Sequence, residues 1–111
     1  REKTSVPIAN LAQTIETLLA DIQETLFRSA KQMLDDHTTA VETYAELANR
    51  AATNAGWSLA HWCGDAACEA RVKTETKATI RCIPRDLPPE PGPCIICGGA
   101  SEQRVIFARA Y

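Results

Sequence analysis

Four cysteines are the residues of this chain whose type and spacing could do chemistry. Cys63 and Cys68 have four residues between them, Cys94 and Cys97 have two, and 25 residues separate the two pairs. Two closely spaced pairs can direct four thiolates at one point, and zinc is the cation that prefers tetrahedral sulfur. The spacing therefore predicts a closed structural metal site with these four cysteines as its ligands.

The neighbours of each pair favour deprotonated sulfur. Gly98 and Gly99 follow the second pair as in a zinc knuckle, where small residues let backbone N–H groups turn toward the sulfurs. Asp65 is expected to cap a short helix over residues 66–73, which would place Cys68 in the first helical turn. Free N–H groups and the positive end of the helix dipole stabilise a thiolate at that position.

Disulfides and a redox pair are the alternatives to a metal site. Five cysteines, no signal peptide and no Asn-x-Ser/Thr sequence fit a secreted disulfide framework poorly. Proline before and glycine after the second pair indicate a loop, whereas the redox pair of a thioredoxin-like enzyme opens a helix after a strand. Cys82 has no partner at turn spacing and is expected to be a buried apolar residue. His61 is not expected to be a ligand, because four cysteines already complete a tetrahedron.

The composition narrows the class of protein. At 111 residues the chain is expected to form one domain with a modest core, which a metal ion would help to stabilise. Its 12 basic residues are scattered and outnumbered by 14 acidic ones, which argues against a dedicated binder of nucleic acid. No apolar run is long enough to span a bilayer. Reduced cysteines without a targeting segment favour the cytoplasm, and a start at Arg1 instead of Met suggests a segment of a longer protein.

Periodic apolar residues predict two main helices. Leu11, Ile15, Leu18, Ile22 and Leu26 recur at helical spacing within residues 10–35, and this stripe is expected to pack in a core instead of forming a coiled coil. A second helix is expected over residues 41–55. Its predicted start is a capping box of Thr39 and Glu42, and its predicted end is Gly56.

Three strands and a stiff loop are predicted around the cysteines. Residues 57–62 and 79–83 have the composition of strands, and 104–111 is expected to be an interior strand covered on both faces. The proline-rich residues 84–93 are expected to be a spacer that aims the second cysteine pair.

These residues together resemble a known family, the C-terminal domain of prolyl-tRNA synthetases of the archaeal and eukaryotic type, which some bacteria also carry. The resemblance covers essentially the whole chain, from Lys3-Thr4 and Val6-Pro7 near its start to its last residue. It rests on the cysteine spacing together with Trp62-Cys63-Gly64-Asp65, Arg81-Cys82-Ile83-Pro84, Cys97-Gly98, Phe107-Ala108 and terminal Tyr111.

The resemblance implies a fold class. It is an α+β two-layer domain, with two main helices packed on a small mixed sheet, similar to the C-terminal domain of translation initiation factor three, plus an appended zinc lobe with four cysteine ligands. One domain would cover residues 1–111, with a helical and sheet part over 1–62, the zinc lobe over 63–99, and the closing strand and C-terminus over 100–111.

The resemblance also implies a function. The parent would be a class II proline–tRNA ligase that activates proline with ATP and magnesium, attaches it to tRNA(Pro), and works as a homodimer. Its catalytic and anticodon-binding domains would lie upstream, and this segment, in which we find no catalytic motif, would support the interdomain architecture. Tyr111 is expected to contribute to an interdomain contact, because in that family the end of the chain turns back toward the catalytic domain.

A stand-alone zinc-ribbon module that binds nucleic acid or protein is the alternative function. Such a module needs a basic surface near the cysteines. Several cations lie near them in the sequence, but Glu69, Glu75 and Asp86 interrupt the series, and we expect the cations to offset the negative charge of the metal–thiolate cluster. The cations in question are Arg71, Lys73, Lys77, Arg81 and Arg85.

Overall fold

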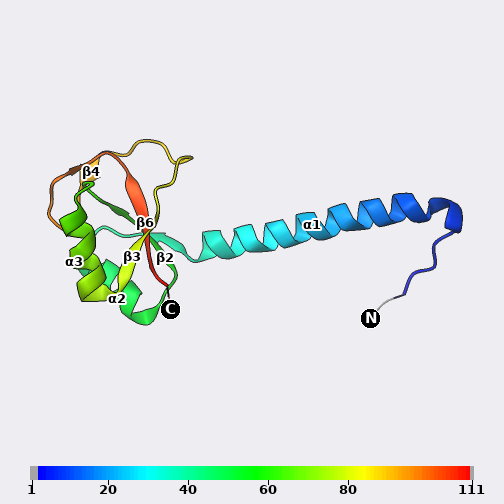
Figure 1. Ribbon diagram of the computed structural model, residues 1–111, viewed down its shortest axis with the longest axis horizontal. Coiled ribbons are helices and arrows are strands. Elements are labelled where there is room, and N and C mark those ends of the chain that lie inside the picture. The colour runs from blue at the N-terminus through cyan, green and yellow to red at the C-terminus, as the bar shows by residue number, and fades with distance from the viewer. Residues whose placement is uncertain (1–2, 111) are drawn as a thin grey trace. The chain divides into compact units, whose positions relative to one another are not determined.

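The computed structural model describes residues 3–110 and divides the chain into two compact units, residues 1–36 and 37–111 (Figure 1). We call them the helical unit and the sheet unit. Their boundary falls inside the 1–62 part of the single domain that the sequence predicted. Within the described residues, no helix has the length and apolarity that crossing a membrane requires.

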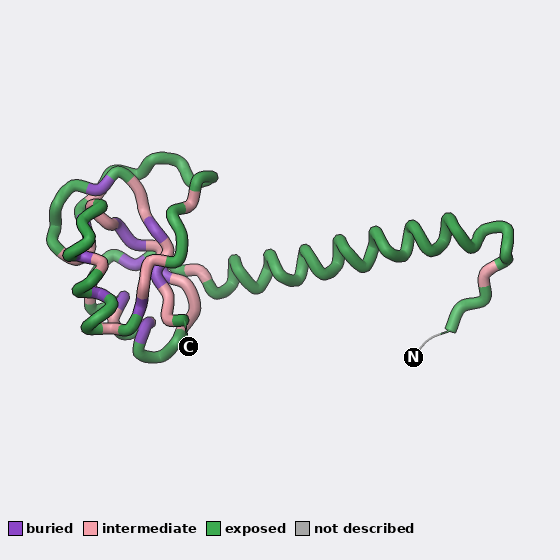
Figure 2. Tube along the Cα trace, viewed as in Figure 1, coloured by how far each residue is buried: buried purple, intermediate pink, exposed green. Residues whose placement is uncertain are grey.

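The helical unit is built around one long helix. A short 3-10 helix, η1 (Ile8–Asn10), leads into α1 (Leu11–Asp36), close to the predicted bounds. Although α1 carries the expected apolar stripe, none of its residues is buried (Figure 2). The core packing expected of this stripe is therefore not observed; Leu18, for example, is 54% exposed and Phe27 61%.

The sheet unit contains a four-stranded mixed sheet in the order β1-β2-β6-β3. β1 and β2 pair in parallel, while β2–β6 and β6–β3 pair antiparallel, with an irregularity in register between Ile80 and Cys82. β4 and β5 form a separate antiparallel pair. The bounds are β1 Thr38–Ala40, β2 Trp57–His61, β3 Ala78–Cys82, β4 Gly92–Pro93, β5 Ala100–Ser101 and β6 Arg104–Arg109.

Two helices accompany this sheet, α2 (Tyr44–Thr53) and α3 (Ala66–Thr76). The predicted N-cap of α2 was wrong by four residues: Thr43 is the N-cap, and its Oγ1 accepts a hydrogen bond from the Glu46 N–H at 3.2 Å. Thr39 cannot fill that role because it lies in β1. The left-handed residue directly after α2 is Asn54, with φ of 52°, where Gly56 was expected.

One core joins the helices to the sheet. β6 is interior, between β2 and β3, as expected. Its burial alternates along the strand instead of being continuous on both faces: Val105 and Phe107 are buried, and the residues between and beside them are only partly so. The α+β class is thus confirmed. The buried cluster comprises Val41, Leu47, Ala51, Ala60, Val72, Ala78, Val105 and Phe107.

Candidate metal centre

The structure brings the four predicted ligands to one point. All four Sγ atoms lie within 4.8 Å of one another. The Sγ atoms of Cys63 and Cys68 are 3.7 Å apart, as are those of Cys63 and Cys97. Cys68 and Cys94 are buried and Cys97 is exposed, so the cluster lies at the edge of the sheet unit. A group of this kind could hold a metal ion.

The first pair is positioned by a strand end and a helix start. β2 ends at His61, and Gly64, with φ of 88°, turns the chain into α3. The side chain of Asp65 caps α3 by accepting a hydrogen bond from the Ala67 N–H at 2.8 Å, as predicted. Cys68 therefore lies in the first turn of α3, where backbone N–H groups have no helical partner.

The second pair is held by a tight loop. The Cys94 N–H donates to the Gly99 carbonyl at 2.7 Å, and the Gly98 N–H donates to the Cys94 carbonyl at 2.8 Å. Gly98 adopts a φ of 74°, which favours glycine. The Gly99 N–H then donates to Cys97 Sγ at 3.3 Å, which is the sulfur-facing backbone expected of a knuckle.

Without a cation, the pKa values of two thiols of the cluster, Cys68 and Cys94, are shifted in opposite directions. Burial, together with hydrogen bonds to Cys97 and Cys63, raises the pKa of Cys68 to about 12. Burial also opposes ionisation of Cys94, but hydrogen bonds with the backbones of Cys97, Ile96 and Cys63 lower its pKa to about 7. A bound cation would stabilise every thiolate at once and lower the pKa of each ligand.

Three other positions that the sequence singled out, Cys82, His61 and Tyr111, are not part of this cluster of described residues. Cys82 is exposed, so the expectation that it is buried was wrong: it is the last residue of the edge strand β3, along which burial decreases from Ala78 to the end. His61 is buried but is not part of the cysteine cluster. Tyr111 lies outside the described residues.

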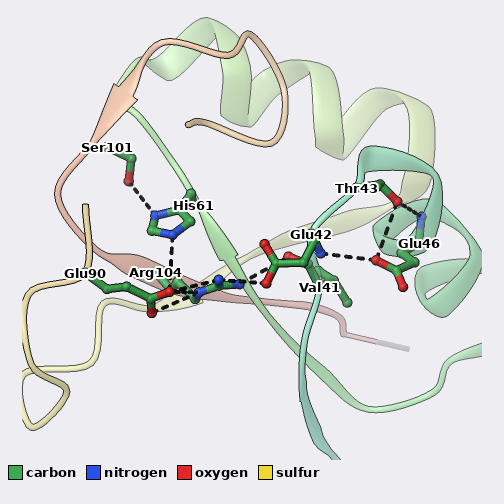
Figure 3. A network of polar contacts seen from close by, with 8 residues as sticks. All are labelled: Val41, Glu42, Thr43, Glu46, His61, Glu90, Ser101 and Arg104. Carbon is green, nitrogen blue, oxygen red and sulfur yellow. Dashed lines mark hydrogen bonds and ion pairs between the residues drawn. The ribbon is translucent and has the colours of Figure 1, made fainter. Parts of the chain in front are cut away.

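A polar network that the sequence did not predict fastens the proline-rich segment to the sheet (Figure 3). The guanidinium of Arg104 donates to both carboxylate oxygens of Glu90, at 2.9 to 3.1 Å, and to the Glu42 carboxylate at 2.7 Å. His61 completes it, with Nε2 3.7 Å from Glu90 and Nδ1 3.3 Å from Ser101 Oγ. The hydrogen bonds of Arg104 hold the pKa of Glu90 below its usual range.

This network fixes where the second cysteine pair approaches the sheet. A Cβ added to Gly92 would lie 2.5 Å from His61 Nε2, so only glycine allows the segment to pass this close. Beyond Gly92, the Ile95 N–H donates to the His61 carbonyl at 3.0 Å. The proline-rich segment is therefore a tethered spacer.

Comparisons with known proteins decide the family. Residues 44–111 match the family described as "Prolyl-tRNA synthetase, C-terminal". The chain belongs to the prolyl-tRNA synthetase C-terminal family. Proteins named proline–tRNA ligase match it over nearly its whole length, which adds α1 to the region in common. The one from Cytophaga hutchinsonii is 46% identical over all of this chain and 23% of its own, and the one from Mycobacterium leprae is 46% identical over 99% of this chain and 23% of its own.

A solved structure extends this family likeness to the fold. The prolyl-tRNA synthetase of Cryptosporidium parvum, crystallised with L-proline and AMP, matches with a TM-score of 0.83 and 30% identity. The match covers 99% of this chain and 24% of that chain. The chain therefore corresponds to about a quarter of the length of its family relatives.

Proposed function

We propose that this chain is the C-terminal structural domain of a proline–tRNA ligase. Its parent would activate proline with ATP and magnesium and attach it to tRNA(Pro), as a cytoplasmic homodimer with catalytic and anticodon-binding domains upstream. The observation that carries the proposal is the identity of 46% over the full chain with a protein named for this activity. The crystallised relative with L-proline and AMP supports the same substrate class.

Within this parent, we assign the cysteine cluster to structural zinc. A tetrahedron with Zn–S bonds of about 2.3 Å has S–S edges of about 3.8 Å, and two of the S–S distances here are 3.7 Å. Sulfur ligands in this number select zinc, and four thiolates leave no position for water or substrate. The residues present therefore fit a zinc ion that holds the lobe together and takes no part in the reaction.

Tyr111 we assign to a contact with the upstream part of the parent. Its position in the sequence, two residues after the end of β6 at Arg109, supports this, because β6 is anchored in the middle of the sheet. Deleting Tyr111 from the full-length protein should impair proline activation without changing the zinc content. Unchanged kinetics would contradict the assignment.

The decisive experiment for the activity is proline-dependent exchange between ATP and pyrophosphate, measured on the full-length protein. Exchange should require proline and magnesium, and it should precede transfer of proline to tRNA(Pro). The absence of exchange, with zinc still bound, would favour a zinc-ribbon module instead of a ligase.

A further inference from the structure

A groove on the sheet unit gathers positive charge that the chain as a whole does not show. It has a volume of about 940 Å³, and its charged lining residues are Lys73, Lys77, Arg81 and Arg109. We call it the basic groove. The remaining lining residues are Ala70, Thr74, Thr79 and Ala110, so no acidic residue lines it.

Three elements build the basic groove. Ala70, Lys73, Thr74 and Lys77 recur at spacings of three, one and three, which places them on one side of α3 and its C-cap. β3 contributes Thr79 and Arg81, two residues apart, and β6 contributes Arg109. Four cations that are dispersed in the sequence thus face one hollow.

These cations are not used to balance acidic groups within the described residues. None of the four forms an ion pair there; Arg81 has only a 3.4 Å hydrogen bond to Thr79 Oγ1, and Arg109 one of 3.5 Å to the Ala51 carbonyl. The buried Nε of Arg109 has no hydrogen-bond partner among them. Arg71 is different: it pairs with Glu75 at 2.9 Å and lies over the Tyr44 ring.

Helix capping does not account for the whole set. Lys73 and Lys77 lie at the C-terminal end of α3, where cations offset the helix dipole. Arg109 donates to the Ala51 carbonyl in the last turn of α2, but Arg81 belongs to a strand and contacts no helix end. Cations gathered without counter-charges repel one another. Binding of an anionic ligand would offset this repulsion, which no acidic group in the lining of the groove does.

The lining residues also indicate which anion is recognised. The groove has no aromatic side chain on which a base could stack and no large apolar side chain that could anchor a protein partner. Lysine, arginine and threonine side chains are donors to phosphate oxygens. We propose that the basic groove binds the phosphate backbone of RNA, that of the tRNA substrate, without reading its sequence. The identification of this RNA as tRNA rests on the proposed function.

The test neutralises the groove in the full-length protein. The variant is Lys73→Gln/Lys77→Asn/Arg81→Gln, with Asn at position 77 because that residue has a φ of 65°, which Asn tolerates. A matched control neutralises three cations outside the groove, Lys3→Gln/Lys31→Gln/Arg85→Gln. Tryptophan fluorescence checks that both variants are folded.

Binding of tRNA(Pro) is then measured between about 50 and 200 mM salt, beside proline-dependent pyrophosphate exchange, which needs no tRNA. The groove variant should raise the Kd about tenfold or more and flatten the slope of log K against log salt by about 2 to 3 units. The control should behave as the wild type, and both variants should retain exchange.

Two outcomes would overturn the proposal. One is an unchanged salt slope in the groove variant. The other is a loss of exchange with unchanged tRNA affinity, which would assign the groove to a contact with an acidic surface of the parent. If the wild type lacks exchange, the proposed ligase function fails, and the difference in RNA binding between groove and control variants still decides the groove.

Discussion

The two units of this chain contain similar apolar residues but use them differently. In the helical unit, α1 repeats leucine and isoleucine at helical spacing, and none of its residues is buried. In the sheet unit, β6 is only six residues long, yet Val105 and Phe107 are 1% and 0% exposed. Local pattern is enough to form a helix, but burial requires other segments to return to it.

The zinc lobe, residues 63–99, differs from both the helical unit and the core of the sheet unit in what holds it in place. Between β3 and β6, the described residues form only the two short strands β4 and β5, and the buried core cluster has no member in the segment 79–104. Cys94 and Cys97 reach the start of α3 through a loop whose two isoleucines, Ile95 and Ile96, pack against the core but are only partly buried. A metal ion is therefore expected to add to this partial burial in holding this part of the sheet unit.

The largest effect should come from breaking the metal site. Cys94→Ser should abolish stoichiometric zinc binding, because three thiolates and a hydroxyl make a much weaker site. Amide hydrogens in residues 63–99 should then exchange on the order of 100-fold faster, since the lobe opens locally. Metal analysis and hydrogen exchange measure both changes.

The helical unit provides the internal control for that experiment. Far-UV circular dichroism of Cys94→Ser should retain the signal of α1 and α2, because neither helix contains a cysteine of the cluster. Cys82→Ser is the matched variant, since Cys82 is exposed and lies outside the cluster; it should bind zinc normally. Global loss of helix in Cys94→Ser would mean that the metal supports the whole chain.

The second largest effect should come from removing one phenylalanine ring in each unit. The two variants compare how much each ring contributes to the free energy of unfolding. Phe107→Ala removes a fully buried ring and should lower the free energy of unfolding by about 3–5 kcal/mol. Phe27→Ala removes a ring that is 61% exposed and should change it by less than about 0.5 kcal/mol. Urea denaturation monitored by tryptophan fluorescence reports on the sheet unit, which holds both Trp57 and Trp62. Equal losses for the two variants would end the contrast between the units.

Features of the fold and the site were predictable from the sequence when the interacting residues are close together in the chain. The cap by Asp65, the knuckle at Gly98 and the bounds of α1 depend on neighbours within a few residues, and all three were predictable. Arg104 contacts Glu90 and Glu42 across 14 and 62 residues. No local pattern marks such a contact, and the cations of the basic groove are dispersed in the same way.

A smaller effect is expected from the Arg104–Glu90 pair. Because hydrogen bonds from Arg104 lower the pKa of Glu90 in the folded state, the pair stabilises the fold above the unfolded pKa, about 4.3. That stabilisation should disappear as the pH falls through the lower pKa of folded Glu90. A double-mutant cycle with Arg104→Gln and Glu90→Gln should therefore give a coupling free energy near pH 7 that shrinks toward pH 3.

The cycle also separates this pair from the metal site. At low pH, protonation of the cysteines releases metal in all four proteins of the cycle. Because none of the four changes a cysteine ligand, the effect of metal release on stability cancels in the coupling free energy. A coupling free energy that stays constant from pH 7 to pH 3 would contradict the role given to Glu90.

The smallest effect should distinguish the observed cap of α2 from the predicted one. Thr43→Ala removes the oxygen that accepts from the Glu46 N–H and should lower the free energy of unfolding by about 1 kcal/mol. Thr39→Ala is the same change at the position that the sequence favoured, but Thr39 is exposed in an edge strand, so its loss should be nearly neutral. The parallel pairing of β1 with β2 extends the chain through residue 40 and leaves no room for a helix to begin at residue 39. A larger loss for Thr39→Ala than for Thr43→Ala would mean that the register of β1 is wrong.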